Sequence, residues 1–140
     1  MRTEVRYYSK NGGTKKLAEA IAKAVGAEAM TVERPLEKFA DVVFLGASVY
    51  AGRPDPAVTQ FISANAKNIG KIVVFGSACT SKSTFPYIKS AAAGCAVKTA
   101  EMFFQCKGEF WLFNKGRPND KDCMGAAEFA QKQIKLLGVT

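Results

Sequence analysis

The sequence contains no histidine, and this absence removes several classes of chemistry at once. Ser-His-Asp and Cys-His catalysis, imidazole acid–base catalysis and imidazole ligation of metals all require that side chain. Cysteine is also sparse, because four residues stand far apart without a CxxC pair or a cluster suited to zinc or iron–sulfur ligation: Cys79, Cys95, Cys106 and Cys123. The sequence therefore predicts neither a metal site nor a catalytic side chain.

Long apolar runs are missing as well. No run is long enough to span a membrane, so no transmembrane segment is expected, and Met1–Glu4 leads into a strand-like segment without a signal peptide. No internal repeat, low-complexity stretch or linker divides the chain, which predicts a single domain over residues 1–140. Since the scattered cysteines are interpreted as reduced thiols, we expect a cytoplasmic protein.

Acidic residues are fewer than basic ones, at 12 Asp and Glu against 20 Lys and Arg, giving a net charge of +8. The basic residues are spread along the chain, without a long run or the interleaved aromatics of an RNA-binding surface, so nucleic acid is not an expected partner. A solvated basic face would explain the composition without any partner. The functional alternatives are an acidic protein partner, an anionic substrate or an anionic membrane surface, each reached by electrostatic steering.

Strand-like and helix-like segments alternate along the chain. Continuous apolar runs are typical of strands buried on both faces of a parallel sheet, and they occupy residues 41–46 and 71–76. Shorter strands are expected at 5–8, 28–33 and 97–105. Helices are expected at 17–25, 55–64, within 87–93 and at 120–137. This alternation predicts an open parallel α/β sheet with right-handed crossovers and helices on both sides.

The turn between the first strand and the first helix carries the most information, and its sequence is Ser9-Lys10-Asn11-Gly12-Gly13-Thr14. Free backbone N–H groups and the positive end of the helix dipole favour an anion at such a helix start. The two glycines permit close approach of the backbone, and the hydroxyl and amide side chains add donors. We expect a phosphate to bind here. An ordinary strand-to-helix turn, in which glycine and serine are common, is the alternative.

This turn matches neither the P-loop nor the GxGxxG pattern. It resembles the phosphate loop of the flavodoxin family, in which a hydroxyl residue, any residue, Thr, Gly, any residue and Thr follow the first strand. Ser9, Gly12 and Thr14 match, and Asn11 replaces a threonine. The resemblance implies a flavodoxin-like α/β fold, with a three-layer, open, twisted parallel sheet of five strands in the order 2-1-3-4-5. It also implies noncovalently bound FMN.

In that topology the loops after the third and fourth strands converge with the first on one site. The resemblance assigns the flavin ring to these two loops, whose expected cofactor residues are Ser48, Val49, Tyr50, Ala51 and Gly52, then Ser77, Ala78, Cys79 and Thr80. Tyr50 offers an aromatic contact to the ring, although a plain loop before a proline-initiated helix is the alternative. The later loop lacks the acidic residue and stacking tyrosine of classical flavodoxins. Cys79 is expected to be a small buried side chain.

These features favour an FMN-binding electron-transfer protein that delivers electrons to an acidic redox protein partner. One alternative is a small FMN-dependent oxidoreductase acting on a quinone or tetrapyrrole, because residues 44–48 and Gly52 also resemble flavodoxin-type menaquinone-dependent protoporphyrinogen dehydrogenases. A second alternative is a flavin-free binding module on the same fold.

The stretch from Cys106 to Pro118 has no place in the short flavodoxin pattern. Its Trp111 and flanking aromatic residues either pack in the core or form an exposed apolar patch for a partner. The sequence sets no expectation for the oligomeric state.

Overall fold

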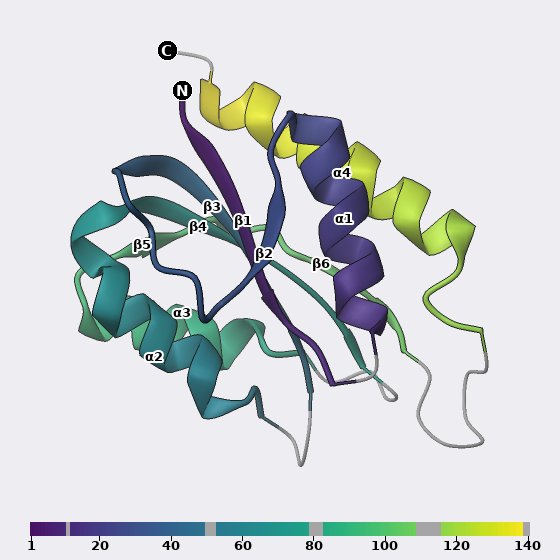
Figure 1. The fold of residues 1–140 in the computed structure, drawn as a ribbon, viewed down its shortest axis with the longest axis horizontal. Coiled ribbons are helices and arrows are strands. Elements are labelled where there is room, and N and C mark those ends of the chain that lie inside the picture. Colours follow the sequence, from purple (N-terminus) through teal and green to yellow (C-terminus); the bar gives the residue numbers. More distant parts are fainter. Residues whose placement is uncertain (11, 50–52, 79–82, 109–115, 139–140) are drawn as a thin grey trace.

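A parallel sheet flanked by helices forms the core of the computed structural model, which describes residues 1–10, 12–49, 53–78, 83–108 and 116–138 (Figure 1). The strands are β1 (Thr3–Tyr8), β2 (Ala29–Thr31), β3 (Ala40–Ser48), β4 (Ile69–Ala78), β5 (Lys98–Thr99) and β6 (Phe104–Lys107). They pair in the order β2-β1-β3-β4-β5, with β6 also on β4, and every pair is parallel. The predicted order 2-1-3-4-5 and the flavodoxin-like α/β fold are confirmed.

Helices cover both faces of this sheet and complete the three layers. They are α1 (Gly13–Val25), α2 (Pro56–Asn65), α3 (Phe85–Gly94) and α4 (Asp120–Gly138), with a 3₁₀ turn at Ala66–Asn68. Figure 1 shows α1 beside α4 and α2 beside α3. The expected signals set two of the boundaries: Asp55 caps α2 by accepting from the Ala57 N–H at 2.9 Å, and Gly26 ends α1 at a φ of 72°. None of the described helices is long and apolar enough to cross a membrane.

The apolar residues form two cores, one on each face of the sheet. On β3, Val43 and Leu45 pack toward α2 and α3, whereas Val42 and Phe44 pack toward α1 and α4. Because successive side chains of a strand point to opposite faces, a strand covered on both sides is apolar throughout. This explains the continuous apolar runs that marked the two central strands in the sequence.

The fifth position in the sheet differs from the expected single strand at 97–105, because two short strands share it. Ile72 on β4 pairs with Thr99, and Phe75 on β4 pairs with Phe104. Between these two pairs β4 spans three residues, whereas the neighbouring segment spans five. The two additional residues cannot stay in register, so residues 101–103 bulge out as an exposed turn.

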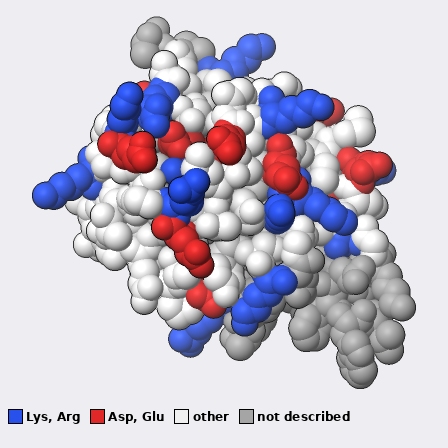
Figure 2. Space-filling model, in the orientation of Figure 1, with Lys and Arg blue, Asp and Glu red and all other residues white. Residues whose placement is uncertain are grey.

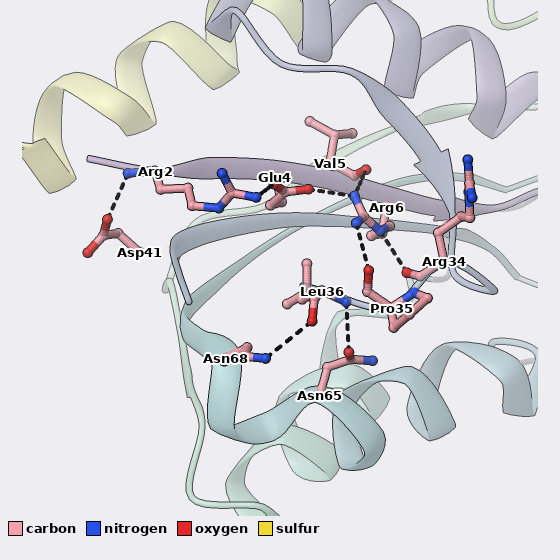
Figure 3. Close-up of polar contacts among 10 residues, drawn as sticks. All are labelled: Arg2, Glu4, Val5, Arg6, Arg34, Pro35, Leu36, Asp41, Asn65 and Asn68. Carbon is pink, nitrogen blue, oxygen red and sulfur yellow. Dashed lines mark hydrogen bonds and ion pairs between the residues drawn. The ribbon is translucent and has the colours of Figure 1, made fainter. Parts of the chain in front are cut away.

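The connection from β2 to β3 crosses β1 and contains no helix. A buried arginine provides hydrogen bonds that a helical backbone would otherwise supply. The Arg6 side chain on β1 is 3% exposed and points at this connection (Figure 3). It donates hydrogen bonds to the carbonyl oxygens of Arg34 at 2.9 Å and Pro35 at 3.3 Å, and to the Glu4 carboxylate at 2.8 Å. A helix would satisfy such carbonyls within its own backbone, whereas here the guanidinium satisfies them.

Two asparagines anchor the same connection from the helical layer. Asn65 on α2 accepts a hydrogen bond from the Leu36 N–H at 2.9 Å and donates to the Phe61 carbonyl at 2.9 Å. Asn68 donates to the Leu36 carbonyl at 3.2 Å (Figure 3). The buried Leu36 is therefore held between β1 and α2, where its side chain joins the core.

We expect Arg6→Met to lower the free energy of unfolding by about 3 kcal/mol, because it leaves the partly buried Arg34 and Pro35 carbonyls without their donor and removes one of the two cations paired with Glu4. Arg6→Lys should rescue little, since an ammonium group lacks the planar fork of donors that reaches several acceptors at once. Urea unfolding measures both variants. Arg34→Lys is the matched control, because Arg34 contributes its backbone carbonyl and its side chain is exposed. Equal stability of Arg6→Met and wild type would contradict this account.

Candidate functional site

Three hydroxyl groups from distant parts of the chain meet at the carboxyl end of the sheet. Thr14 in the first turn of α1 places its Oγ1 2.6 Å from Ser48 Oγ at the end of β3. The same Thr14 atom lies 3.2 Å from Ser77 Oγ near the end of β4, and the two serine oxygens are 3.4 Å apart. We call Thr14, Ser48 and Ser77 the hydroxyl cluster. It ties the start of α1 to the ends of β3 and β4, as the predicted convergence of loops requires.

The register of β3 on β4 sets this cluster, because Ser48 pairs directly with Ser77. Two glycines allow β3 and β4 to approach closely, one directly before Ser77 and the other two residues before Ser48. A Cβ at Gly76 would lie 2.2 Å from the Ala47 carbonyl oxygen, and one at Gly46 would lie 2.2 Å from the Phe75 ring. Any larger residue at these positions would push the strands or the ring apart. The sequence therefore places both serines on the α1 side of the sheet.

The amino terminus of α1 points at the same place and carries no cap. Gly12 occupies the N-cap position at a φ of 80°, and no side chain in the described part of the chain caps the first turn. Ser9 Oγ instead accepts from the Gly12 N–H at 2.9 Å, which tightens the turn before the helix. The backbone N–H groups of the first turn lack intrahelical acceptors, and the helix dipole adds positive potential there. This arrangement suits an anion.

The charges and contacts around the turn favour the same guest. The first turn of α1 has no acidic residue, and Lys10, Lys15 and Lys16 are exposed beside it. One side is closed by the chain that enters α4, because a Cβ at Gly13 would lie 2.9 Å from Pro118 Cδ. On the other side, a Cβ at Gly12 would meet no described atom within 4 Å. Among the described residues, the turn is therefore covered on one side by Pro118, open at Gly12 and surrounded by positive charge.

These features fit the phosphate group of FMN, the cofactor that the resemblance implies. An uncapped helix start with glycine at its entry can present backbone donors to phosphate oxygens. A second observation also favours a ligand. Thr84, which follows the loop after β4, has a buried Oγ1 without a hydrogen-bond partner among the described residues. A buried hydroxyl without a partner costs about 1–3 kcal/mol, which a ligand can recover. Sequence reasoning missed Thr84, although it directly precedes the Phe85-Pro86 helix start.

The structure brings together all of the expected cofactor residues that it describes: Ser9, Lys10, Gly12, Gly13, Thr14, Ser48, Val49, Ser77 and Ala78. Val49, for example, donates its N–H to the Ser77 carbonyl at 3.3 Å, which joins the starts of the two ring loops. The remaining residues lie outside the described part of the chain: Asn11, Tyr50, Ala51, Gly52, Cys79 and Thr80. Trp111 does too, so both interpretations of its role stand as predictions.

Three free cysteines occur in the described part of the chain: Cys95, Cys106 and Cys123. Burial, reinforced by the Asp122 charge, raises the pKa of the Cys106 thiol to about 12. Burial also raises the pKa of Cys123, whose Sγ lies 3.8 Å from the Lys16 carbonyl oxygen. Both thiols therefore stay protonated at neutral pH, which makes them poor nucleophiles.

A family model described as a flavodoxin domain matches residues 5–111, which include the turn at residues 9–14, the hydroxyl cluster and the two loops expected to hold the flavin ring. The chain belongs to the flavodoxin family. Among curated proteins, an uncharacterised protein of Methanocaldococcus jannaschii is 28% identical over 141 residues, covering 87% of this chain and 90% of that protein.

Solved structures of flavodoxins share the fold of this chain. A flavodoxin from the domain Archaea superimposes with a TM-score of 0.80 at 17% identity, covering 99% of both chains. Oxidised flavodoxin 1 from Bacillus cereus gives a TM-score of 0.72 at 18% identity, covering 96% of this chain and 98% of that one. At these identities the likeness establishes the shared architecture alone.

We expect alkylation of Cys106 by iodoacetamide at pH 8 to be about a thousandfold slower in the folded protein than in urea. A thiol whose pKa rises from 9.0 to about 12 loses nearly all of its thiolate at that pH. Mass spectrometry of the peptide that contains Cys106 measures the rate in both states. Similar rates in the folded and unfolded protein would show that this thiol is not shielded.

Proposed function

We propose that this flavodoxin-family chain acts in the cytoplasm as a single domain that binds FMN and delivers electrons to a redox protein partner. The proposal rests on one observation: the start of α1, which no described side chain caps, contacts the ends of β3 and β4 at the hydroxyl cluster. In open α/β sheets, ligands bind at this edge, where the strand order reverses. The family membership supports a flavin as the ligand.

In this proposal, the backbone N–H groups of Gly13 and Thr14 hold the phosphate, and Ser9 fixes the turn that aims them. The Thr14 side chain is fully buried, so it contributes by joining the helix start to Ser48 and Ser77. Rigid positioning matters because a preorganised site loses little conformational entropy when its donors bind an anion. The loops after β3 and β4 then enclose the flavin ring.

FMN, when bound, supplies the electron-transfer chemistry, and the protein sets its position and potential. Lys10, Lys15 and Lys16 are exposed around the phosphate turn and make the local potential positive. Positive potential lowers the cost of the negative charge that reduced FMN carries. We therefore propose a less negative reduction potential than acidic flavodoxins have.

The partner we propose is an acidic redox protein, because the chain carries a net charge of +8. Figure 2 shows Lys and Arg side chains lying among Asp and Glu side chains on the face that it displays. On this face the excess positive charge is therefore distributed and does not form one patch. Attraction of this kind speeds the encounter with an acidic partner and weakens as salt is added.

We expect the protein to bind FMN at least about a hundredfold more tightly than riboflavin, which lacks only the phosphate. Gly12→Asp should weaken FMN binding at least about tenfold relative to Gly12→Asn, because the two side chains have the same shape and only the aspartate repels phosphate. Both fit the open space at this position and share the cost of its positive φ. Quenching of flavin fluorescence measures all four affinities.

Urea unfolding of the two Gly12 variants is the control, because an aspartate at an N-cap favours the helix and should leave the fold intact. Equal affinities for FMN and riboflavin would contradict a phosphate site. Equal FMN affinities of Gly12→Asp and Gly12→Asn would place the phosphate away from α1.

A further inference from the structure

A cavity lies between β6 and the first turns of α4, on the far side of β6 from β4. Its volume is about 830 Å³, within the range of about 300–1,000 Å³ that is typical of small-molecule sites. Residues Phe104 to Lys107 of β6 form one wall, and Lys121, Asp122 and Gly125 of α4 form another. The expected FMN residues contribute nothing to its described lining.

An aromatic ring gives this cavity an apolar surface. Phe104 is partly buried, and its ring centroid lies 6.0 Å from that of Phe129 on α4, which fixes its position. Gly125 lies opposite Phe104, and a Cβ there would be 3.4 Å from Phe104 Cε1. Because glycine has no side chain, α4 leaves this edge of the ring accessible to the cavity. A flat apolar ligand can stack or pack edge-on against such a ring.

The charged groups of the lining leave a positive balance. Arg117 donates to both carboxylate oxygens of Asp122, at 2.6 and 2.8 Å, and the Asn119 N–H donates to the same carboxylate at 2.9 Å. The bond from Arg117 also holds the pKa of Asp122 below its usual value, so this carboxylate stays ionised and paired. Lys121 lines the cavity too, and it forms no ion pair with any described residue. Lys107 also contributes to the lining, but strand alternation directs its side chain to the face of the sheet opposite Phe104 and Cys106.

We propose that this cavity binds a flat aromatic carboxylate, with its ring against Phe104 and its carboxylate beside Lys121. The apolar wall and the Lys121 ammonium group, which forms no ion pair with a described residue, match the two halves of such a molecule. The described lining shares no residue with the expected FMN site, so binding of the probe does not require FMN. The two sites are neighbours, because β6 pairs with the end of β4 that carries Ser77.

Titration of the ¹⁵N-labelled full chain with naphthalene-2-carboxylate, followed by amide spectra, tests this proposal. We expect saturable shifts at Gln105, Lys121 and Gly125, both without FMN and with FMN in excess. The neutral compound 2-naphthylmethanol should bind about tenfold more weakly, because it keeps the ring and lacks the charge. Shifts confined to residues 9–14 and to Ser48 and Ser77 would overturn the proposal, since the probe would then occupy the proposed flavin site.

A pair of charge-reversed variants separates the site from general attraction by a basic protein. Lys121→Glu should weaken binding of naphthalene-2-carboxylate about tenfold or more. Lys132→Glu changes the net charge equally on an exposed part of α4 and should leave the affinity within about twofold. Equal losses in both variants, or no saturable shift at all, would overturn the proposal. The FMN and riboflavin affinities test the flavin site separately, so the failure of either site can be told from the other.

Discussion

The parallel pairing of β3 with β4 is the constraint on which the candidate site depends. Gly46 makes room for the Phe75 ring, and Gly76 makes room for the Ala47 carbonyl, so the two strands fit in a single register. That register puts Ser48 opposite Ser77, and Thr14 then closes the cluster from α1. A slip of β4 by one residue would turn Ser77 to the other face of the sheet and remove its contact with Thr14.

The position of β1 matters equally, because the phosphate turn follows this strand directly. Different elements cover the two faces of β1. The helices α1 and α4 pack on Val5 and Tyr7, and the connection from β2 to β3 covers Arg6 on the other face. A buried guanidinium is expensive unless several acceptors surround it, and this connection provides them from its own backbone. The arginine and the connection therefore stabilise each other, and together they fix the strand from which the phosphate turn emerges.

The parallel α/β sheet could be predicted from local patterns, and its strand order from the resemblance to the flavodoxin family. Apolar runs marked β3 and β4 as doubly covered strands, and the Gly12-Gly13 turn predicts an anion site before α1. Contacts between distant residues could not be predicted in this way. Arg6 in a strand is normally expected to face solvent, and its acceptors lie about thirty residues away. The packing of Pro118 on Gly13 and the unpartnered Thr84 hydroxyl depend on tertiary structure too. The division of the edge strand depends on two residues that no periodicity reveals.

A crystal structure of the FMN-saturated protein tests most directly whether the start of α1 holds the phosphate of FMN. We predict phosphate oxygens about 3 Å from the backbone nitrogens of Gly13 and Thr14, with the flavin ring between the loops that follow β3 and β4. We also predict that Thr14, Ser48 and Ser77 stay in contact beneath the ligand. A phosphate bound elsewhere, such as beside Lys121, with the first turn of α1 facing water, would contradict this prediction.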